Sequence, residues 1–385
     1  MASETKDDAP GTAYTGFDHV HWWVGNAKQT ADWYTSRMGF KRVAYRGLET
    51  GSRDVVTHVV VQGTIRFAFS SQLNVGATTC LGADMGEHFV KHGDAVKDVA
   101  FAVEDCRRIF EAAKARGAEV VSEPEEVTDD DGTVVMATIK TYGDTLHTFV
   151  ERGSYSGAFL PGFKAVEEVD PLVTCTPPVA LDFIDHCVGN MPPDGMIPAV
   201  EWYEKKLQFH RFWSVDDSQI HTEYSSLRSV VMADPSERVK MPINEPAEGK
   251  RKSQIQEYVD YYGGPGVQHI ALNTRNIINA ITQLRARGVR FLRVPDSYYE
   301  LLKVRLEKSG IEVKEDLAEL QRLNILVDFD DSGYLLQLFT APLMDRPTVF
   351  LEIIQREGNS GFGAGNFKSL FESIEREQAA RGNLV

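Results

Sequence analysis

One pattern occurs twice in this chain of 385 residues, and the duplication limits the possible folds more than any other feature. The paired segments, first copy before second, are Asp18-His19 and Asp185-His186, Trp33-Tyr34 and Trp202-Tyr203, Gly39-Phe40 and Gln208-Phe209, Val96–Ala100 and Val267–Ala271, and Arg116-Gly117 and Arg287-Gly288. Each copy is long enough to bury a core of its own. The sequence therefore predicts two modules with the same architecture.

Within each copy, apolar residues first alternate as in a strand and then recur at helical spacing. Further strands are expected at Val55–Val61, Ile65–Ser70, His221–Tyr224 and Ser229–Met232. A second helix over 104–116 ends at Gly117, and its partner ends at Gly288, because glycine favours the left-handed turn that follows a helix. The expected class is α+β.

Four segments lie outside the repeat. Residues 1–14 are polar and acidic and are expected to form a disordered tail. The stretch 153–180 contains four prolines and is expected to be an extended linker. Residues 296–324 have helical spacing and form an insertion in the second copy, and residues 366–385 form a terminal helix. The predicted modules are therefore residues 15–152 and 181–365.

The composition excludes several classes of partner. The net charge is −15 and no run of Lys or Arg offsets it, so nucleic acid and anionic membranes are unsuitable partners. The chain has no run of 18 apolar residues that could span a bilayer. Its four cysteines are scattered without a CxxC pair, which favours a reducing compartment. We expect a soluble, cytoplasmic protein that binds small molecules.

A glycine-rich run at 361–365 precedes the terminal helix. It lacks the GxGxxG spacing of dinucleotide-binding loops, and the segments around it do not form a βαβ unit. We interpret it as a hinge rather than a nucleotide site.

The two copies differ at the positions where a metal would bind. His186, His269 and Glu352 each interrupt an apolar strand of the second copy, whereas Asp98 and Thr148 occupy the last two positions in the first. A lone buried histidine or glutamate can be a core residue with satisfied hydrogen bonds. Three such groups on three strands of one module predict a metal site instead, since a buried carboxylate is costly without compensation. His19, without this partner set, is expected to be structural.

Two histidines and one carboxylate form the facial triad of non-haem Fe(II) oxygenases, but the same ligands can hold catalytic zinc. The sequence has no HExxH motif and no spare Glu or His poised as a general base. Amides and aromatic rings near the triad suit an aromatic substrate with a polar head. A metal-free binding protein on the same scaffold is the alternative, although it would not need three buried ionisable groups.

Several longer strings resemble the 4-hydroxyphenylpyruvate dioxygenase family, and the likeness runs from about Phe17 to the C-terminus. They are Tyr45–Ser52, Leu207–Ser226, Ser253–Tyr261, Gly266–Ala271, Leu335–Phe339 and Phe350–Gly365. The resemblance implies two vicinal oxygen chelate modules, similar to glyoxalases and extradiol dioxygenases, in which paired βαβββ units form open β-barrels. It places the iron in the C-terminal module and makes the N-terminal module vestigial.

The resemblance also assigns roles to single residues. His186, His269 and Glu352 fall on the Fe(II) ligands. The implied substrate pocket contains Ser229, Asn244, Gln254, Gln268, Gln337, Phe339, Phe350, Phe362 and Phe367. Asn366 and Phe371 belong to the terminal helix region that is expected to gate the pocket. Gln268 precedes His269 on a strand and would face away from the metal unless the strand bends, so its role could be indirect.

The implied activity is Fe(II)-dependent conversion of 4-hydroxyphenylpyruvate and O2 to homogentisate and CO2. Hydroxymandelate synthase shares the substrate, the iron and the fold, and it is the alternative activity. Relatives form dimers or tetramers, so we expect a homo-oligomer, with a dimer favoured.

Overall fold

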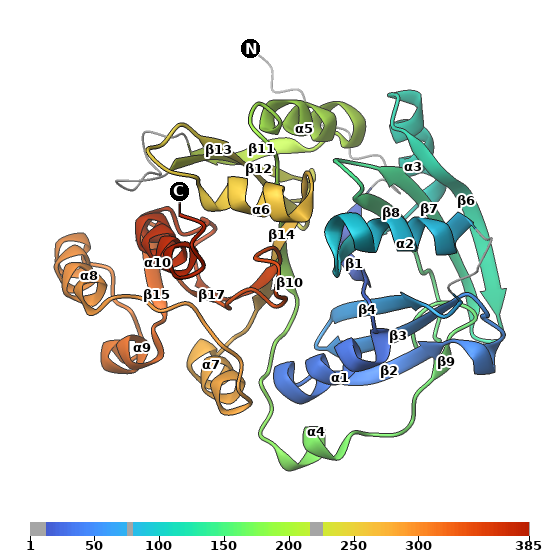
Figure 1. Ribbon diagram of the computed structural model, residues 1–385, viewed down its shortest axis with the longest axis horizontal. Coiled ribbons are helices and arrows are strands. Elements are labelled where there is room, and N and C mark those ends of the chain that lie inside the picture. The colour runs from blue at the N-terminus through green and yellow to red at the C-terminus, as the bar shows by residue number, and fades with distance from the viewer. Residues whose placement is uncertain (1–12, 75–79, 216–225, 385) are drawn as a thin grey trace.

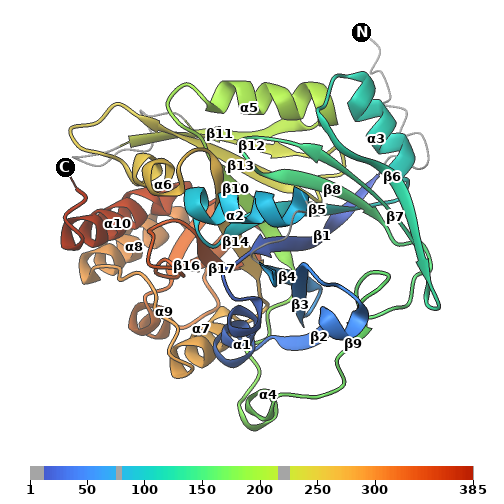
Figure 2. The same cartoon turned by 45° about the vertical axis from the view of Figure 1, so that its right-hand side comes forward.

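The computed structural model describes residues 13–74, 80–215 and 226–384, and it has two halves that each contain one curled sheet with helices packed against it (Figure 1). The first half is coloured blue to green and the second yellow-green to red. Figure 1 shows the two sheets side by side, and in Figure 2 α4 lies on the connection below them. The halves follow the duplication in the sequence.

The first half contains three helices and the strands of a nine-stranded sheet. Its elements are β1 (Tyr14–Trp23), α1 (Ala27–Met38), β2 (Lys41–Arg46), the 3₁₀ turn η1 (Leu48–Thr50), β3 (Val55–Gln62), β4 (Ile65–Gln72), α2 (Cys80–His92), β5 (Ala95–Val103), α3 (Cys106–Ala115), β6 (Val120–Asp129), β7 (Gly132–Lys140) and β8 (Leu146–Glu151). The connection to the second half adds β9 (Lys164–Ala165), which pairs with β2, and α4 (Pro171–Cys175).

The second half repeats this order and adds helices. Its elements are β10 (Ile184–Asn190), α5 (Met196–Trp202) continued by the π-turn η2 (Tyr203–Leu207), β11 (His210–Val215), β12 (Ser226–Ala233), β13 (Lys240–Ala247), α6 (Gln254–Tyr262), β14 (Gly266–Asn273), α7 (Ile277–Ala286), α8 (Asp296–Ser309), α9 (Leu317–Leu323), β15 (Leu326–Asp330), β16 (Gly333–Phe339), β17 (Phe350–Glu357), η3 (Ala364–Asn366) and α10 (Phe367–Ala380).

The strand order within each sheet confirms the paired βαβββ units. The second sheet runs β11-β12-β13-β10-β14-β17-β16-β15, and the first has the matching order β2-β3-β4-β1-β5-β8-β7-β6 with β9 added at the β2 edge. In each half, two βαβββ units meet at an antiparallel pair, β1 with β5 and β10 with β14. The two curled sheets and the terminal helix confirm the α+β class expected from the sequence.

The strand register confirms that Thr148 and Glu352 are equivalent positions. Asp98 lies opposite Leu146 in the parallel pair of β5 and β8, and His269 lies opposite Phe350 in the parallel pair of β14 and β17. Counting two residues on from each partner reaches Thr148 and Glu352. The same polypeptide geometry therefore exists with and without the candidate ligands.

Gly39 and Gln208 end the first helical segment of their halves in the same way. Both have a left-handed backbone, with φ of 76° and 59°. The next residue, Phe40 or Phe209, donates its backbone N–H to the tyrosine carbonyl of the repeat at 3.2 Å. The backbone of the turn is thus retained although only one copy has the glycine that adopts it without strain.

The structure differs from the sequence expectations at several boundaries. The predicted tail ends too late, because Tyr14 begins β1 and its ring packs edge-on against Phe209 at 5.2 Å. The linker is not extended throughout, since it contains β9 and α4. Helices α2 and α6 were not predicted, whereas α8 and α9 confirm the helical insertion. The strand expected at His221–Tyr224 lies outside the described residues, as do residues 1–12 of the tail.

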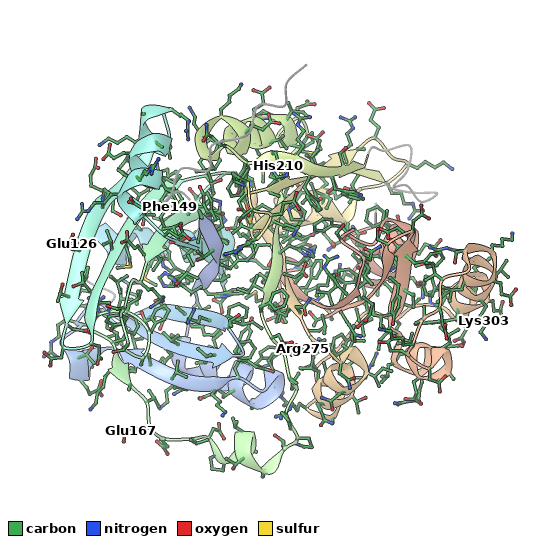
Figure 3. All side chains as sticks on the ribbon, turned by 180° about the vertical axis from the view of Figure 1, so that it is seen from behind. Glu126, Phe149, Glu167, His210, Arg275 and Lys303 are labelled. Atoms are coloured by element: carbon green, nitrogen blue, oxygen red, sulfur yellow. The ribbon has the colours of Figure 1, made fainter. Side chains whose placement is uncertain are left out.

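The largest apolar core includes residues from both halves. Figure 3 shows Phe149 among the side chains that fill the first half, while Glu126 and Lys303 lie at the outer edges. Across the halves, the ring of His147 on β8 shares a buried 2.7 Å hydrogen bond with the hydroxyl of Tyr203. Within the described ranges, none of the helices combines the length and apolar character that a membrane span requires.

Candidate metal centre

Three adjacent strands of the second sheet bring the three candidate ligands together. His186 lies on β10, His269 on β14 and Glu352 on β17, which are neighbours in that order. Oε2 of Glu352 is 3.2 Å from Nε2 of His186 and 3.4 Å from Nε2 of His269. All three residues are buried, and their ligand atoms lie within 4.8 Å of one another. The sheet order alone therefore assembles the group.

This group fits a divalent first-row metal. Such metals bind imidazole nitrogen and carboxylate oxygen at about 2.1 Å, so ligands at right angles lie about 3 Å apart. The two observed separations are close to this value. Two nitrogens and one oxygen arranged on one side leave positions for other ligands. Among the described residues, this is the one group of at least three His, Cys, Asp or Glu side chains with such spacing.

Burial and hydrogen bonding set the protonation of the three groups. Burial would raise the pKa of Glu352, but hydrogen bonds and charge interactions with the two histidines hold it well below its ordinary value. Burial lowers the pKa of His269. It would do the same at His186, but hydrogen bonds to Asp185 and Glu352 raise the pKa of that ring. A carboxylate anion and a neutral His269 imidazole are the forms that bind a metal.

Asp185 and Arg356 orient His186, and neither was identified as functional from the sequence. Asp185 Oδ1 accepts from Nδ1 of His186 at 2.8 Å, which leaves Nε2 free to face Glu352. Arg356 donates two hydrogen bonds to the same carboxylate, from Nε and from Nη2, both at 2.8 Å. Hydrogen bonds from these partners keep the pKa of Asp185 far below its ordinary range despite burial. The repeat could have indicated this pair, because Asp18 and Arg152 recur at the equivalent positions and form the same hydrogen bonds in the first half.

Replacing Asp185 by Asn is expected to weaken metal binding by about 10- to 100-fold, because the Nδ1 proton of His186 loses its anionic acceptor. Anaerobic titration of the metal-free protein with Fe(II) measures this change. Asp18→Asn makes the same substitution at the equivalent position of the first half and should leave metal affinity unaltered. Equal affinities for the two variants would contradict the orienting role.

Aromatic rings surround the triad. The ring of Phe350 stacks on His269 with centroids 4.9 Å apart and an angle of 17°. Phe339 meets the same imidazole edge-on at 5.9 Å. Phe362 lies 5.1 Å from the ring of His186 on the other side. Three predicted pocket residues therefore contact the candidate ligands directly and form apolar walls around them.

Two glutamines lie close to the triad in different ways. The amide oxygen of Gln268 is 2.9 Å from Nδ1 of His269, so this side chain reaches the histidine beside it and can orient its ring. Gln337 is 1% exposed, and both atoms of its amide lack a hydrogen-bond partner among the described residues. Gly363 presses against this amide, because a Cβ there would overlap it. A buried amide without partners is costly, so Gln337 is poised to bind a polar ligand group.

The remaining polar candidates lie on neighbouring elements. Ser229 on β12 is opposite Asn244 on β13, and Nδ2 of Asn244 donates to Asn190 Oδ1 at 3.4 Å. Asn190 ends β10, the strand that carries His186. Gln254 begins α6 and lines a small pocket with Gln268 and Phe350. Their described contacts link them to neighbours of the triad strands and not to the triad itself.

The terminal helix α10 packs against α6 and lies beside the second sheet (Figure 1). Phe371 is buried on its inner face. Asn366, just before the helix, accepts a 2.7 Å hydrogen bond from the hydroxyl of Tyr298 on α8. The side chain of Phe367 lies outside the described residues. The insertion thus holds the start of α10, a contact that the sequence did not indicate.

A family model described as the Glyoxalase/Bleomycin resistance protein/Dioxygenase superfamily matches residues 16–144 and 183–338, one segment in each half. A protein of Yarrowia lipolytica named 4-hydroxyphenylpyruvate dioxygenase is 60% identical over 97% of this chain and 94% of its own length. Proteins with the same name from Danio rerio and Dictyostelium discoideum are 61% and 59% identical, over 97% and 96% of this chain and 93% and 100% of their own.

Solved structures show the same architecture. A mutant of 4-hydroxymandelate synthase from Streptomyces coelicolor superimposes with a TM-score of 0.79 at 27% identity, covering 95% of this chain and 99% of that one. A fusion of a xylose isomerase-like TIM barrel with 4-hydroxyphenylpyruvate dioxygenase reaches a TM-score of 0.71 at 22% identity, over 95% of this chain and 53% of its own, and supports the fold alone. The duplicated modules, the buried triad and the relatives at about 60% identity together show that this chain is a member of the 4-hydroxyphenylpyruvate dioxygenase family.

Proposed function

We propose that the protein is an Fe(II)-dependent dioxygenase that converts 4-hydroxyphenylpyruvate and O2 to homogentisate and CO2 in tyrosine catabolism. The observation that carries the proposal is the buried His186, His269 and Glu352 group, in a chain about 60% identical to proteins named for this activity. One oxygen atom enters the new carboxylate and the other enters the ring, while the side chain loses CO2 and moves to the adjacent carbon. These changes account for both atoms of O2.

The triad is proposed to hold Fe(II), and the 2-oxo acid of the substrate would chelate that metal through two oxygens. The bound metal would supply the oxygen chemistry of the reaction. His186, His269 and Glu352 would hold the metal and leave positions for substrate. The hydrogen bonds from His186 to Asp185 and from Arg356 to Asp185 would keep the His186 ring in a fixed orientation. Zinc would suit the same ligands but would not supply the oxidation that this reaction needs.

The pocket residues would bind and orient the organic substrate. Phe339 and Phe350 provide apolar surface next to His269, where an aromatic ring can lie. The unpartnered amide of Gln337 can hydrogen-bond a polar substituent of that ring or a water beside it. The proposed roles of Ser229, Asn244, Gln254 and Phe367 in substrate binding rest on the family resemblance. Helix α10, with Asn366 and Phe371, would close the pocket and exclude water.

Hydroxymandelate synthase is the second candidate activity, because a mutant of that enzyme is a solved structural neighbour. The two reactions begin from the same substrate and differ in the carbon that receives oxygen. The pocket rings therefore decide the outcome by the position in which they hold the substrate ring.

Product analysis separates these candidates. The protein is incubated aerobically with Fe(II) and 4-hydroxyphenylpyruvate, and the products are identified by chromatography and mass spectrometry. Homogentisate with one equivalent of CO2 is the expected result. Hydroxymandelate would establish the second activity, and unchanged substrate would favour a non-catalytic binding protein. Repeating the reaction with Zn(II) in place of Fe(II) should give no product.

We further propose a cytoplasmic location and a homodimer. Cys106, Cys175 and Cys187 form no disulfide among the described residues, which supports a reducing compartment. Light scattering of the purified protein tests the dimer.

A further inference from the structure

The first half contains a cavity of about 540 Å³ inside its curled sheet, a volume typical of small-molecule sites. It lies in the half that lacks the triad. Its walls include side chains from β1, β3, β4 and β5, the helix α2 and the connection after β8. A cavity of this size is unusual in a module that serves only as support, because protein interiors are normally filled.

The cavity keeps several contacts of the candidate metal centre. Phe159 meets the ring of His19 edge-on at 5.0 Å and lies 5.5 Å from the guanidinium of Arg152. In the second half, Phe362 meets His186 at 5.1 Å and lies 5.5 Å from the guanidinium of Arg356. Phe159 of the linker therefore occupies the place beside His19 that Phe362 of the glycine-rich segment occupies beside His186. The pocket architecture is present in both halves.

The cavity differs from the candidate metal centre in the side chains at the positions equivalent to the metal ligands. Asp98 replaces His269, and both its oxygens accept hydrogen bonds from Thr148, one from the backbone N–H at 3.0 Å and one from the hydroxyl. That carboxylate is therefore already satisfied. Within the described part of the chain, the first half has no group of three metal-binding side chains. The cavity is consequently suited to binding an organic molecule rather than a metal.

Lys97 supplies a positive charge to this cavity. It is equivalent to Gln268, since it precedes Asp98 as Gln268 precedes His269. Its ammonium lies 4.7 Å from the ring centre of Trp23 and donates to the carbonyl of Asp144 at 2.7 Å. Both Trp23 and Lys97 line the cavity. An ammonium has three protons to donate, and the described contacts use one of them in a hydrogen bond.

The rest of the lining separates into polar and apolar parts. The ring of His21 is 2.7 Å from the hydroxyl of Ser70, which is 2.6 Å from that of Thr57, so these groups form a connected polar row. The apolar wall consists of Trp23, Val55, Ala68, Met85, Leu146, Phe159, Leu160 and Phe163. Arg46 and Arg53 also line the cavity and are exposed to solvent. Asp54 and Asp98 line the cavity too, so two carboxylates oppose the three positive groups of Arg46, Arg53 and Lys97, and a small positive charge remains on a chain of net charge −15.

We propose that the cavity of the first half is a second small-molecule site, which binds an organic anion with an aromatic or apolar body. The anionic group pairs with Lys97, and the body lies against Leu146 and Phe159. Arg46 and Arg53, which are exposed and line the cavity, attract the anion toward it. This site is separate from the candidate metal centre and does not depend on the activity proposed for it.

Fluorescence titration with 1-anilinonaphthalene-8-sulfonate tests the proposal on the full-length protein, because this probe has both an anionic group and an aromatic body. Lys97→Met is expected to weaken one class of binding sites by at least tenfold. Lys140→Met is the matched control, since Lys140 is an exposed lysine on β7 that pairs with Glu119. Its titration should match that of the unaltered protein.

Two further measurements distinguish this site from general apolar binding. N-phenyl-1-naphthylamine has the same aromatic body without the sulfonate, and its affinity should be the same for Lys97→Met and the unaltered protein. Leu160→Trp, which fills the cavity from the linker, should remove the same class of sites for the anionic probe. If both Lys97→Met and Leu160→Trp bind the anionic probe as the unaltered protein does, the proposal is wrong.

Discussion

Replacement of Glu352 by Gln is expected to remove stable Fe(II) binding and to lower oxygen-dependent turnover by at least about 1,000-fold, well beyond the 10- to 100-fold typical for partners outside the ligand set. The amide is neutral and presents a weaker donor between the two imidazoles. The side chain keeps its size, so the three strands should still pack. Metal content of the purified variant and oxygen uptake with 4-hydroxyphenylpyruvate measure the two effects.

Glu151→Gln is a matched control in the first half. Glu151 accepts the backbone N–H of Cys106 at 2.9 Å, and Gln355 accepts that of Ile277 at 2.8 Å in the second half. The second half therefore already uses glutamine at this place, so the control should fold and turn over normally. Normal turnover by Glu352→Gln would reject the assignment of the metal centre.

Deletion of residues 366–385 is expected to lower turnover by about 100-fold or more while leaving most of the Fe(II) bound. The three candidate ligands lie on strands β10, β14 and β17, so the deletion removes none of them. It removes Phe371 and the rest of α10, which would admit water to the pocket. The measurements are iron content and product formed per oxygen consumed. The second is included because an open pocket should also consume oxygen without forming product.

A single substitution tests the same role without removing the helix. Arg381 pairs with the buried carboxylate of Glu257 on α6 at 2.9 Å, and Asn383 donates to it at 2.8 Å. Arg381→Met leaves that carboxylate short of a partner, a cost of about 1–3 kcal/mol, and should loosen α10. Arg376→Met alters an exposed arginine of the same helix and should have no effect. If Arg381→Met and the deletion both turn over as fast as Arg376→Met, helix α10 does not gate the pocket.

The duplication predicted most of the architecture, because a repeated pattern must fold the same way twice. It also identified the candidate metal centre, since Asp98 and Thr148 showed that the scaffold does not require His269 and Glu352. The strand register bears out that comparison. The identity of the metal does not follow from ligand type, because the same three side chains suit iron and zinc.

Other features depend on contacts between distant segments, which periodicity does not reveal. Asp185 and Arg356 lie 171 residues apart in the sequence, and although both recur in the repeat, their hydrogen bonds appear only when the strands are in place. The cavity of the first half is lined by Phe159 and Phe163, which belong to a segment expected to be an extended linker. This half was expected to be vestigial because Asp98 and Thr148 stand where the second half has metal ligands, and that difference does not reveal a cavity.

The aspartate–arginine pairs also have a consequence for the order in which the chain folds. Each pair connects the first strand of a half to the end of the strand β8 or β17, and its partners are 134 residues apart in the first half and 171 in the second. A nascent first half therefore cannot form its pair until Arg152 has left the ribosome, and the second half must wait for Arg356. Since domains generally fold as units from the N-terminus during synthesis, the first half can form its pair before the strands of the second half have left the ribosome. It would then present a finished surface, including His147, on which the second half assembles.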